Sequence, residues 1–195
     1  METVPTLRDR KKAATSEALH RAAMRLAKEH GLDQVTVEAI AEAANVSRRT
    51  FSNYFANKED ALLYGYRASI DRMLAEVRER PAAEPAWQAL RASAPVMYEA
   101  MAEADPEGIA RWRMMRTHPT LLAAHMALHA RFEADLAAEL ANRTDDPLAA
   151  RLMATAYLAT IRISAQYWLE HPQAGTLIEV INQALDRMGA DFTAR

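Results

Sequence analysis

Apolar residues recur every three or four positions along nearly the whole of this 195-residue chain, the spacing that places them on one face of an α-helix. Alanine, the strongest helix former, occurs 42 times, whereas valine and isoleucine, which favour strands, occur seven times each. Half of the residues are hydrophobic, so the chain can bury a sizeable core. We therefore expect an all-α fold and exclude a sheet-rich one.

Clusters of proline, glycine and asparagine divide this pattern into nine predicted helices. Gly31 is placed to end the first helix, and Asn57 is placed to begin the fourth. Pro95 falls inside the fifth helix, which should therefore be kinked or split. The predicted helices span residues 7–30, 37–44, 48–54, 58–80, 86–103, 107–117, 120–142, 147–170 and 176–191.

The charge of the chain is divided along its length. Residues 1–58 hold ten Lys and Arg against seven Asp and Glu, a formal charge of +3. The remaining residues hold 14 against 19, a formal charge of −5, so the whole chain is not a polycation that coats nucleic acid. We expect a basic N-terminal domain over residues 1–57 and an acidic C-terminal domain over residues 58–195, connected by the helix 58–80.

The sequence contains no cysteine, which excludes disulfides, thiol nucleophiles and thiolate zinc sites and is typical of a reducing cytoplasm. The basic start of the chain leads into an amphipathic pattern rather than an apolar block, so we expect no signal peptide. No run approaches the about 18 uncharged apolar residues that a membrane span requires. These features predict a soluble cytoplasmic protein.

The sequence shows neither a nucleophile–base pair nor a glycine-rich phosphate loop, so we expect no catalysis and no cofactor. His125, His129 and Glu133 follow one another at intervals of four residues, a spacing that a divalent metal can use. The glutamate of a His-Glu-x-x-His motif is missing, however. We therefore predict no metal site and leave open whether these three side chains bind anything.

Residues 36–58 have the features of a helix-turn-helix, in which two helices cross closely through a tight turn. Ala41 is small enough for the two helix backbones to approach each other, and Asn45, four residues later, tolerates a left-handed turn conformation. Phe51 can anchor the second helix in the core. Thr36 and Ser47 are placed to cap the first and second helices.

The second helix of such a motif lies in the major groove of DNA, where its N-terminal side chains reach the base edges. Arg48 and Arg49 suit the O6 and N7 atoms of guanine, and Lys58 suits a phosphate. The basic residues of segment 8–12 are expected beside the DNA or, alternatively, form a solvated charge run. The predicted DNA-binding residues are Thr36, Ser47, Arg48, Arg49, Thr50, Asn53, Tyr54 and Lys58.

This stretch resembles the TetR family of bacterial transcriptional regulators. The resemblance covers about the first 65 residues and implies an all-helical homodimer whose three N-terminal helices bind operator DNA and whose divergent C-terminal domain binds an inducer. Asn45 stands where the family often has glycine, which is harmless because asparagine tolerates the same geometry. Arg49 stands where the family often has a small residue, so base recognition is expected to differ from that of a typical member. The matching residues are Gly31, Thr36, Val37, Ile40, Ala41, Ala44, Val46, Ser47, Thr50, Tyr54, Phe55, Asn57, Lys58 and Glu59.

Segment 111–122 resembles the group of this family that has an acyl-CoA-like ligand domain. The C-terminal domain is also rich in methionine and aromatic residues, which line adaptable apolar pockets but equally fill ordinary cores. Arg116 suits a phosphate or carboxylate, with a structural ion pair as the alternative. The predicted ligand-binding residues are Trp87, Met101, Trp112, Met115, Arg116, Tyr157 and Trp168.

The predicted helix 147–170 is apolar around most of its circumference, which requires burial on several sides. In a small domain this favours a subunit interface, and an internal core helix is the alternative. The last helix has one apolar face that can pair with it. The predicted interface residues are Tyr157, Ile161, Leu177, Ile181 and Leu185.

We therefore expect a ligand-responsive repressor that binds a pseudo-palindromic operator as a homodimer, with half-sites about one helical turn or somewhat more apart. A small apolar or acyl-type ligand would release it by shifting the helix that begins at Lys58. The alternatives are a DNA-binding activator and a helical enzyme or small-molecule or lipid carrier without DNA function. The expected partners are double-stranded operator DNA, a second copy of the chain and the inducer. Binding to the operator would associate the protein with the nucleoid.

Overall fold

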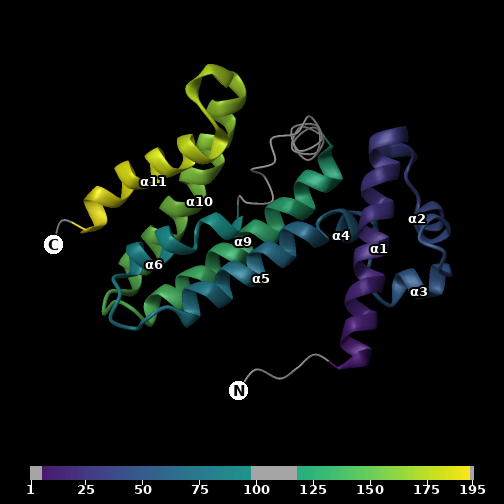
Figure 1. The fold of residues 1–195 in the computed structure, drawn as a ribbon, viewed down its shortest axis with the longest axis horizontal. Helices are drawn as coiled ribbons and strands as arrows, with labels where there is room; N and C mark the ends of the chain where they lie inside the picture. The colour runs from purple at the N-terminus through teal and green to yellow at the C-terminus, as the bar shows by residue number, and fades with distance from the viewer. Residues whose placement is uncertain (1–5, 98–117, 194–195) are drawn as a thin grey trace. The chain divides into compact units, whose positions relative to one another are not determined.

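The computed structural model describes residues 6–97 and 118–193, which Figure 1 draws as ribbons. Every regular element in these two ranges is helical, and no strand occurs among them. The predicted all-α fold class is therefore confirmed. The described residues form nine α-helices and two short 3₁₀ turns: α1 (Leu7–His30), η1 (Leu32–Gln34), α2 (Val37–Ala43), α3 (Arg48–Ser52), α4 (Lys58–Leu62), α5 (Tyr64–Glu79), α6 (Ala86–Ser93), α9 (Pro119–Ala141), α10 (Pro147–Glu170), η2 (Pro172–Ala174) and α11 (Leu177–Thr193).

Most of the helices that the sequence predicts are present within a few residues of their expected ends. Helix α10 has the predicted bounds because Asp146 caps it, its carboxylate accepting from the amides of the first turn at 2.9 and 3.2 Å. Helix α6 ends at Ser93, before Pro95, so the predicted split is confirmed. The end of the predicted helix 86–103 and the whole of the predicted helix 107–117 lie outside the described residues.

The contacts divide the described chain into two compact units. The first contains residues 6–68 and 118–126, and the second contains residues 69–97 and 127–193. Helices α5 and α9 contribute residues to both units. Within the first unit, α1 packs against α2, η1 and α4. The domain boundary that we place between residues 57 and 58 stays a prediction.

The prediction of a single helix over residues 58–80 is wrong. The chain instead forms two helices, α4 and α5, that meet at a turn at Leu63. The physical reason is a side chain from α1. His20 Nδ1 lies 2.8 Å from the carbonyl oxygen of Ala61, an acceptor that a continuous helix would give to the amide of Gly65. The same ring lies so near Gly65 that a Cβ there would be 3.1 Å from His20 Nε2. A side chain inserted into the hydrogen-bond ladder is a recognised cause of a break in a helix.

Aromatic rings connect α3 to α1 through the start of α5. Phe51 of α3 lies 5.8 Å from Phe55, Phe55 lies 5.7 Å from Tyr64, and Tyr64 lies 5.8 Å from His20, measured between ring centroids. The Phe55–Tyr64 pair is edge-to-face, an arrangement that the ring quadrupoles favour. Phe51 is 1% exposed. Phe51 and Phe55 belong to the buried core of the first unit, and Tyr64 and His20 are half-buried beside them.

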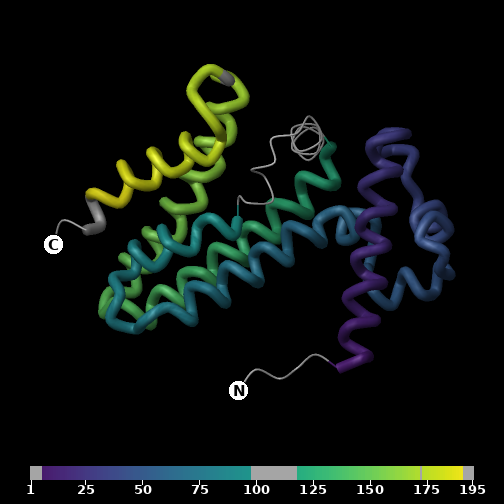
Figure 2. Tube along the Cα trace, viewed as in Figure 1, coloured from purple at the N-terminus to yellow at the C-terminus, as the bar shows by residue number. Residues whose placement is uncertain are grey.

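The core of the second unit lies where α6, α10 and α11 pack together. Figure 2 traces α10 into the η2 turn and on into α11, and these two helices share the largest packing contact of the unit. Each of these helices contributes a fully buried side chain to this core: Leu90, Tyr157 and Ile181 are each 0% exposed. The Tyr157 hydroxyl donates to the Sδ of Met73 at 3.2 Å, so the buried phenol has a partner.

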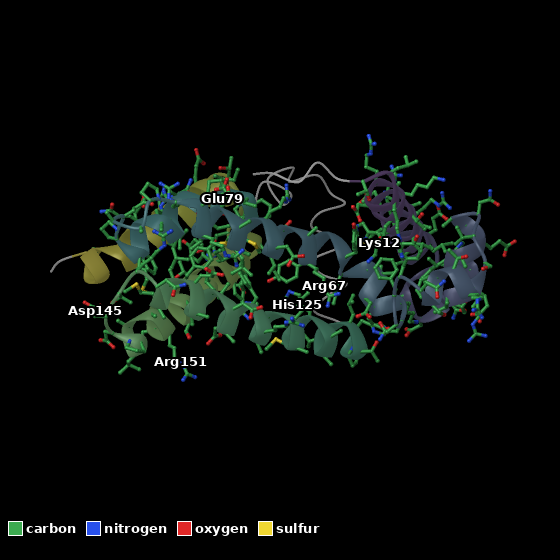
Figure 3. All side chains as sticks on the ribbon, turned by 90° about the horizontal axis from the view of Figure 1, so that it is seen from below. Lys12, Arg67, Glu79, His125, Asp145 and Arg151 are labelled. Atoms are coloured by element: carbon green, nitrogen blue, oxygen red, sulfur yellow. The ribbon has the colours of Figure 1, made fainter. Side chains whose placement is uncertain are left out.

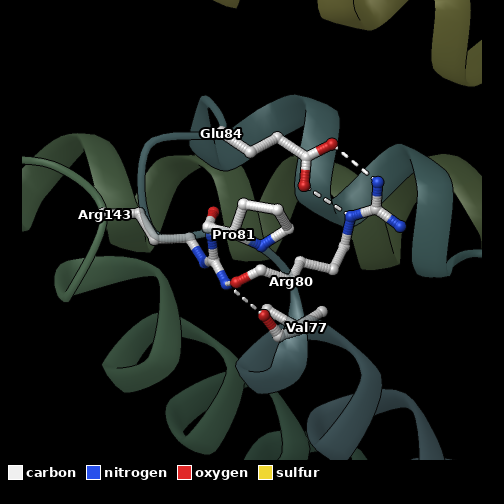
Figure 4. Close-up of polar contacts among 5 residues, drawn as sticks. All are labelled: Val77, Arg80, Pro81, Glu84 and Arg143. Carbon is white, nitrogen blue, oxygen red and sulfur yellow. Dashed lines mark hydrogen bonds and ion pairs between the residues drawn. The ribbon is translucent and has the colours of Figure 1, made fainter.

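The C-terminal end of α5 is held by one arginine from the segment between α9 and α10 (Figure 4). The guanidinium of Arg143 donates to the carbonyl oxygens of Pro81 at 2.6 Å and Arg80 at 2.8 Å, and also to that of Val77. Carbonyls at a helix C-terminus have no intrahelical partner and attract cations. Beside them, Arg80 forms an ion pair with Glu84 over two contacts of 2.5 and 2.7 Å.

Arg143→Met should lower the free energy of unfolding by about 2 kcal/mol, because it leaves the carbonyls at the end of α5 without their charged donor. Urea unfolding followed by circular dichroism measures this. Arg151→Met is the matched control, since Arg151 on α10 is exposed and points away from the helices (Figure 3). Equal midpoints for the two variants would contradict the role of Arg143.

Candidate nucleic-acid interface

Helices α2 and α3 form a helix-turn-helix whose inner side is buried. Ile40 is 0% exposed and Ala41 is 2% exposed, and both lie on α2. The amide of Val46 donates to the carbonyl oxygen of Ala41 at 2.9 Å and closes the turn between the helices. Phe51 anchors α3 in the core, as its apolar character predicts.

Asn45 provides the left-handed residue that this turn needs. Its φ is +54°, and it is the non-glycine residue with positive φ among those that the structure describes. The left-handed conformation costs asparagine less free energy than it costs most other residues. The prediction that Asn45 replaces the common glycine in the turn is therefore confirmed.

Three predicted caps set where the short helices begin. The Thr36 hydroxyl accepts from the amide of Ala39 at 3.1 Å, and the Ser47 hydroxyl accepts from the amide of Thr50 at 3.0 Å. Asn57 Oδ1 likewise accepts from the third amide of α4, at 2.8 Å. These side chains hold the backbone of the motif, and Thr36 and Ser47 are also exposed.

The outward face of α3 carries the side chains predicted to reach DNA. Arg48, Arg49 and Asn53 are exposed, and Thr50 and Tyr54 are half-buried. The side chain of Arg48 is 73% exposed. With Phe51 turned inward, the two arginines of the first turn are available to a groove of DNA.

Glu38 on α2 contacts the exposed face of α3, and the sequence interpretation did not predict this contact. Arg48 Nε lies 3.1 Å from Glu38 Oε1, which comes from the first turn of α2. The two residues are ten positions apart and meet only because the turn brings their helices together. Sequence spacing contains no signal for such a contact. The contact engages Nε of Arg48.

Lys58 lies at the start of α4, as predicted, but its ammonium has partners inside the protein. Nζ donates to the carbonyl oxygens of Leu32 at 2.8 Å and Val35 at 3.0 Å. The side chain is half-buried. Lys58 therefore differs from the exposed arginines of α3.

A second basic surface lies on the first turns of α1, where Arg8, Arg10, Lys11 and Lys12 are exposed (Lys12 is labelled in Figure 3). This helix begins with a reciprocal cap. The amide of Asp9 donates to the Thr6 hydroxyl, and the amide of Thr6 donates to the Asp9 carboxylate. The Thr6 hydroxyl also donates to the Asp9 carboxylate at 2.6 Å, and this bond, together with that from the Thr6 amide, lowers the pKa of Asp9.

The beginning of α9 also belongs to the unit that contains this motif. His118 Nε2 lies 2.7 Å from Asp33 Oδ1, and Thr120 Oγ1 donates to Glu59 Oε1 at 2.8 Å. Further along α9, the ring of His125 lies 4.9 Å from that of Tyr66 on α5. Burial raises the pKa of Tyr66 to about 12, so this phenol is neutral at ordinary pH.

The predicted ligand residues are only partly within the described chain. Trp87 is 4% exposed on α6, Tyr157 donates to Met73, and Trp168 Nε1 donates to the carbonyl oxygen of Gly175 at 3.0 Å. Met101, Trp112, Met115 and Arg116 lie outside the described residues.

A groove of about 610 Å³ runs between α6 and α11 and includes Trp87 in its lining. Its lining also includes charged side chains: Arg91 Nε and Asp186 Oδ1 form an ion pair of 2.7 Å there, and the hydrogen bond from Arg91 lowers the pKa of Asp186. The floor requires glycine, since a Cβ on Gly189 would lie 2.0 Å from Trp87 Nε1. The groove is open to solvent, and the ligand site that the sequence predicts stays a prediction.

The residues predicted for a dimer interface lie mostly in the core of the second unit. Tyr157, Leu177, Ile181 and Leu185 are at most 5% exposed, and Ile161 is half-buried. Helices α10 and α11 cover these side chains against each other and against α6. The exposed apolar residues of these helices are Leu148, Leu152, Ile163, Tyr167 and Met188.

The three residues with metal-like spacing have separate environments. His125 packs on Tyr66, and Glu133 Oε1 accepts from the Thr155 hydroxyl at 2.7 Å. Burial lowers the pKa of His129. No cluster of His, Asp and Glu suited to a metal ion occurs in the described part of the chain. None of its helices has the length and apolar character to cross a membrane.

Comparison with known sequences finds a family match in each half of the chain. Residues 19–66 match the family described as "Bacterial regulatory proteins, tetR family", and residues 84–193 match the MftR C-terminal domain. The HTH-type transcriptional regulator TcmR of Streptomyces glaucescens is 31% identical over 192 residues, which cover 93% of this chain and 84% of TcmR.

Comparison with solved structures identifies the fold. SmeT, described as the repressor of the Stenotrophomonas maltophilia multidrug efflux pump SmeDEF, has a TM-score of 0.65 at 19% identity, covering 92% of this chain and 91% of SmeT. A complex of SmeT with triclosan has a TM-score of 0.67 at 18% identity, covering 91% of each chain. FadR of Thermus thermophilus, a transcriptional repressor in complex with lauroyl-CoA, has a TM-score of 0.57 at 24% identity, covering 89% of this chain and 92% of FadR.

Proposed function

Since the chain belongs to the TetR family of bacterial regulatory proteins, we propose that it is a repressor that binds operator DNA as a homodimer and is released by a small acyl-type ligand. The relatives that match it are transcriptional regulators, and the chain is a regulator rather than an enzyme. The repressor role, the dimer and the ligand are our proposal.

The observation that carries the DNA-binding part is the orientation of α3. Its inner residue, Phe51, is buried, so Arg48 and Arg49 project from the protein at the N-terminal end of the helix. That end of a recognition helix is the one that reaches base edges in the major groove. Arg48 and Arg49 would read guanine, with Thr36, Ser47, Thr50, Asn53 and Tyr54 on the backbone or base edges around them.

A homodimer is supported by an apolar stripe on the solvent side of α10. Leu152, Ile163 and Tyr167 are 53%, 57% and 48% exposed, and their spacing places them on one face of the helix. Exposed apolar residues that share one face of a helix are typical of an interaction surface. Two copies joined there by a two-fold axis would present their recognition helices to a pseudo-palindromic operator.

The ligand is proposed by analogy with relatives and by composition. The FadR structure contains lauroyl-CoA, and the second family match, over residues 84–193, covers the domain in which an inducer would bind. Helices α5 and α9 contribute residues to both units, so a ligand that moves either helix would also act on residues of the DNA-binding unit. By linkage, such a ligand and the operator weaken each other's binding by the same factor.

The DNA-binding proposal predicts sequence-specific binding to DNA upstream of the regulated genes, with Arg48 as a determinant. Arg48→Ala should weaken operator binding by about 1–3 kcal/mol and relax discrimination at one base position in each half-site. Fluorescence anisotropy with the operator and its single-base variants measures both effects. Thr15→Ala on α1 is the control for a substitution away from α3. Unchanged discrimination in Arg48→Ala would remove this residue from the reading surface.

The dimer proposal predicts that Ile163→Glu separates the subunits, because a carboxylate in an apolar interface loses its hydration without a partner. Sedimentation velocity should show a shift from dimer to monomer, and operator affinity should fall with it. Met126→Glu is a matched control, since Met126 is 55% exposed but lies on α9. A dimer that survives Ile163→Glu would place the interface elsewhere.

The ligand proposal predicts that lauroyl-CoA releases the operator. Its addition should weaken operator binding about tenfold, within the usual range of allosteric coupling, whereas coenzyme A without the acyl chain should leave binding unchanged. Anisotropy titrations with each compound measure this. If neither lauroyl-CoA nor a longer acyl-CoA changed the affinity, the acyl-type ligand would be rejected while DNA binding stood.

A further inference from the structure

We propose that Lys58 is a positioning residue: its ammonium holds the turn before α2 against the start of α4 and thereby orients the recognition helix, instead of contacting a DNA phosphate. The inference rests on the proposed DNA binding. It concerns the one residue of the predicted DNA-binding set whose charged group is engaged by two backbone carbonyls in the free protein.

The contact joins two segments that are 23 or more residues apart in the sequence. Lys58 Nζ donates to the carbonyl oxygen of Leu32 at 2.8 Å and to that of Val35 at 3.0 Å. Leu32 is 4% exposed and Val35 is 3% exposed, so water has little access to their surroundings. An ammonium has three donors, and this arrangement uses two of them.

The Val35 carbonyl depends on this donor. Among the residues that the structure describes, no backbone amide donates to it outside the regular helices, whereas the Leu32 carbonyl also accepts from the amide of Val35 at 3.2 Å. A buried carbonyl without a donor loses the hydrogen bond that water gives it in the unfolded chain. Lys58 therefore stabilises the specific position of this turn.

The position of that turn determines where α2 begins. Val35 directly precedes Thr36, whose hydroxyl caps α2 by accepting from Ala39 at 3.1 Å. Helix α2 has only seven residues, and its last turn leads through the bond from Val46 to Ala41 into α3. A displacement of Val35 is therefore carried to Arg48 and Arg49 through a short, closely bonded path.

The surroundings of Lys58 do not favour a phosphate. The first turn of α4 also contains Glu59 and Asp60, whose carboxylates carry negative charge at the helix N-terminus. Asp60 Oδ2 accepts from the amide of Ala56 at 3.2 Å, and Asn57 Oδ1 accepts from the amide of Asp60. Two groups that could bind an anion are thus already occupied by side chains of the protein.

The test compares Lys58→Met, which keeps the stem and removes the charge, with Lys58→Arg, which keeps the charge and changes the shape of the donor. For a positioning role, both variants should bind the operator about tenfold more weakly, the loss that one charged hydrogen bond represents. Binding to random-sequence DNA should stay near that of the parent. The salt dependence of operator binding should keep the parent's slope in Lys58→Met.

A phosphate contact would give the opposite pattern. Lys58→Met would lower the slope of log affinity against log salt by about 0.9 and weaken specific and random DNA alike. Lys58→Arg would keep the affinity, since guanidinium binds phosphate as well as ammonium does. That pattern would overturn the proposal.

A readout without DNA separates this inference from the proposed function. In Lys58→Met, amide hydrogen exchange of Ile40, which donates to the Thr36 carbonyl at the start of α2, should be faster than in the parent. Asn57→Ala is the matched control, because it removes the cap of α4 without touching the turn before α2. The control should leave the exchange of Ile40 and the ratio of operator to random-DNA affinity unchanged. If Ile40 exchanged at the parent's rate in Lys58→Met, the proposal would fail even where DNA binding was established.

Discussion

The chain of ring contacts from Phe51 through Phe55 and Tyr64 to His20 is the interaction on which the DNA-binding unit depends. Helix α3 has five residues, too few to be stable alone, so its direction comes from the ring that it buries. The same aromatic group includes the His20 ring that interrupts the helix at Leu63. One cluster therefore sets both the outward face of α3 and the separation of α4 from α5.

Around this apolar cluster, polar groups determine the details of position. Lys58 binds the carbonyls before α2, His20 binds the carbonyl of Ala61, and Arg143 binds the carbonyls at the end of α5. Each side chain reaches backbone carbonyls of a segment distant in the sequence, at the end of a helix or in a turn. Apolar burial decides which faces meet, and these contacts decide where each short helix begins or ends.

The parts of the DNA interface that depend on near neighbours could be predicted from the sequence. The caps at Thr36, Ser47 and Asn57 and the positive φ of Asn45 involve groups within about four residues of each other. The pairing of Arg48 with Glu38 could not be predicted, because its partners meet only after α2 and α3 have crossed. The acceptors of Lys58 lie 23 and 26 residues away, so this contact could not be predicted from the sequence for the same reason.

By itself, the sequence determined the all-α class, most helix positions among the described residues, and the helix-turn-helix with its exposed arginines. These follow from the spacing of apolar residues and from side chains that bond to their own helix. The tertiary structure alone decided that Tyr157, Leu177, Ile181 and Leu185 belong to the core of the second unit, and that the helix over 58–80 divides at Leu63. Periodicity identifies which face of a helix is apolar. Which neighbour covers that face, or inserts into it, depends on contacts between distant segments that no local pattern contains.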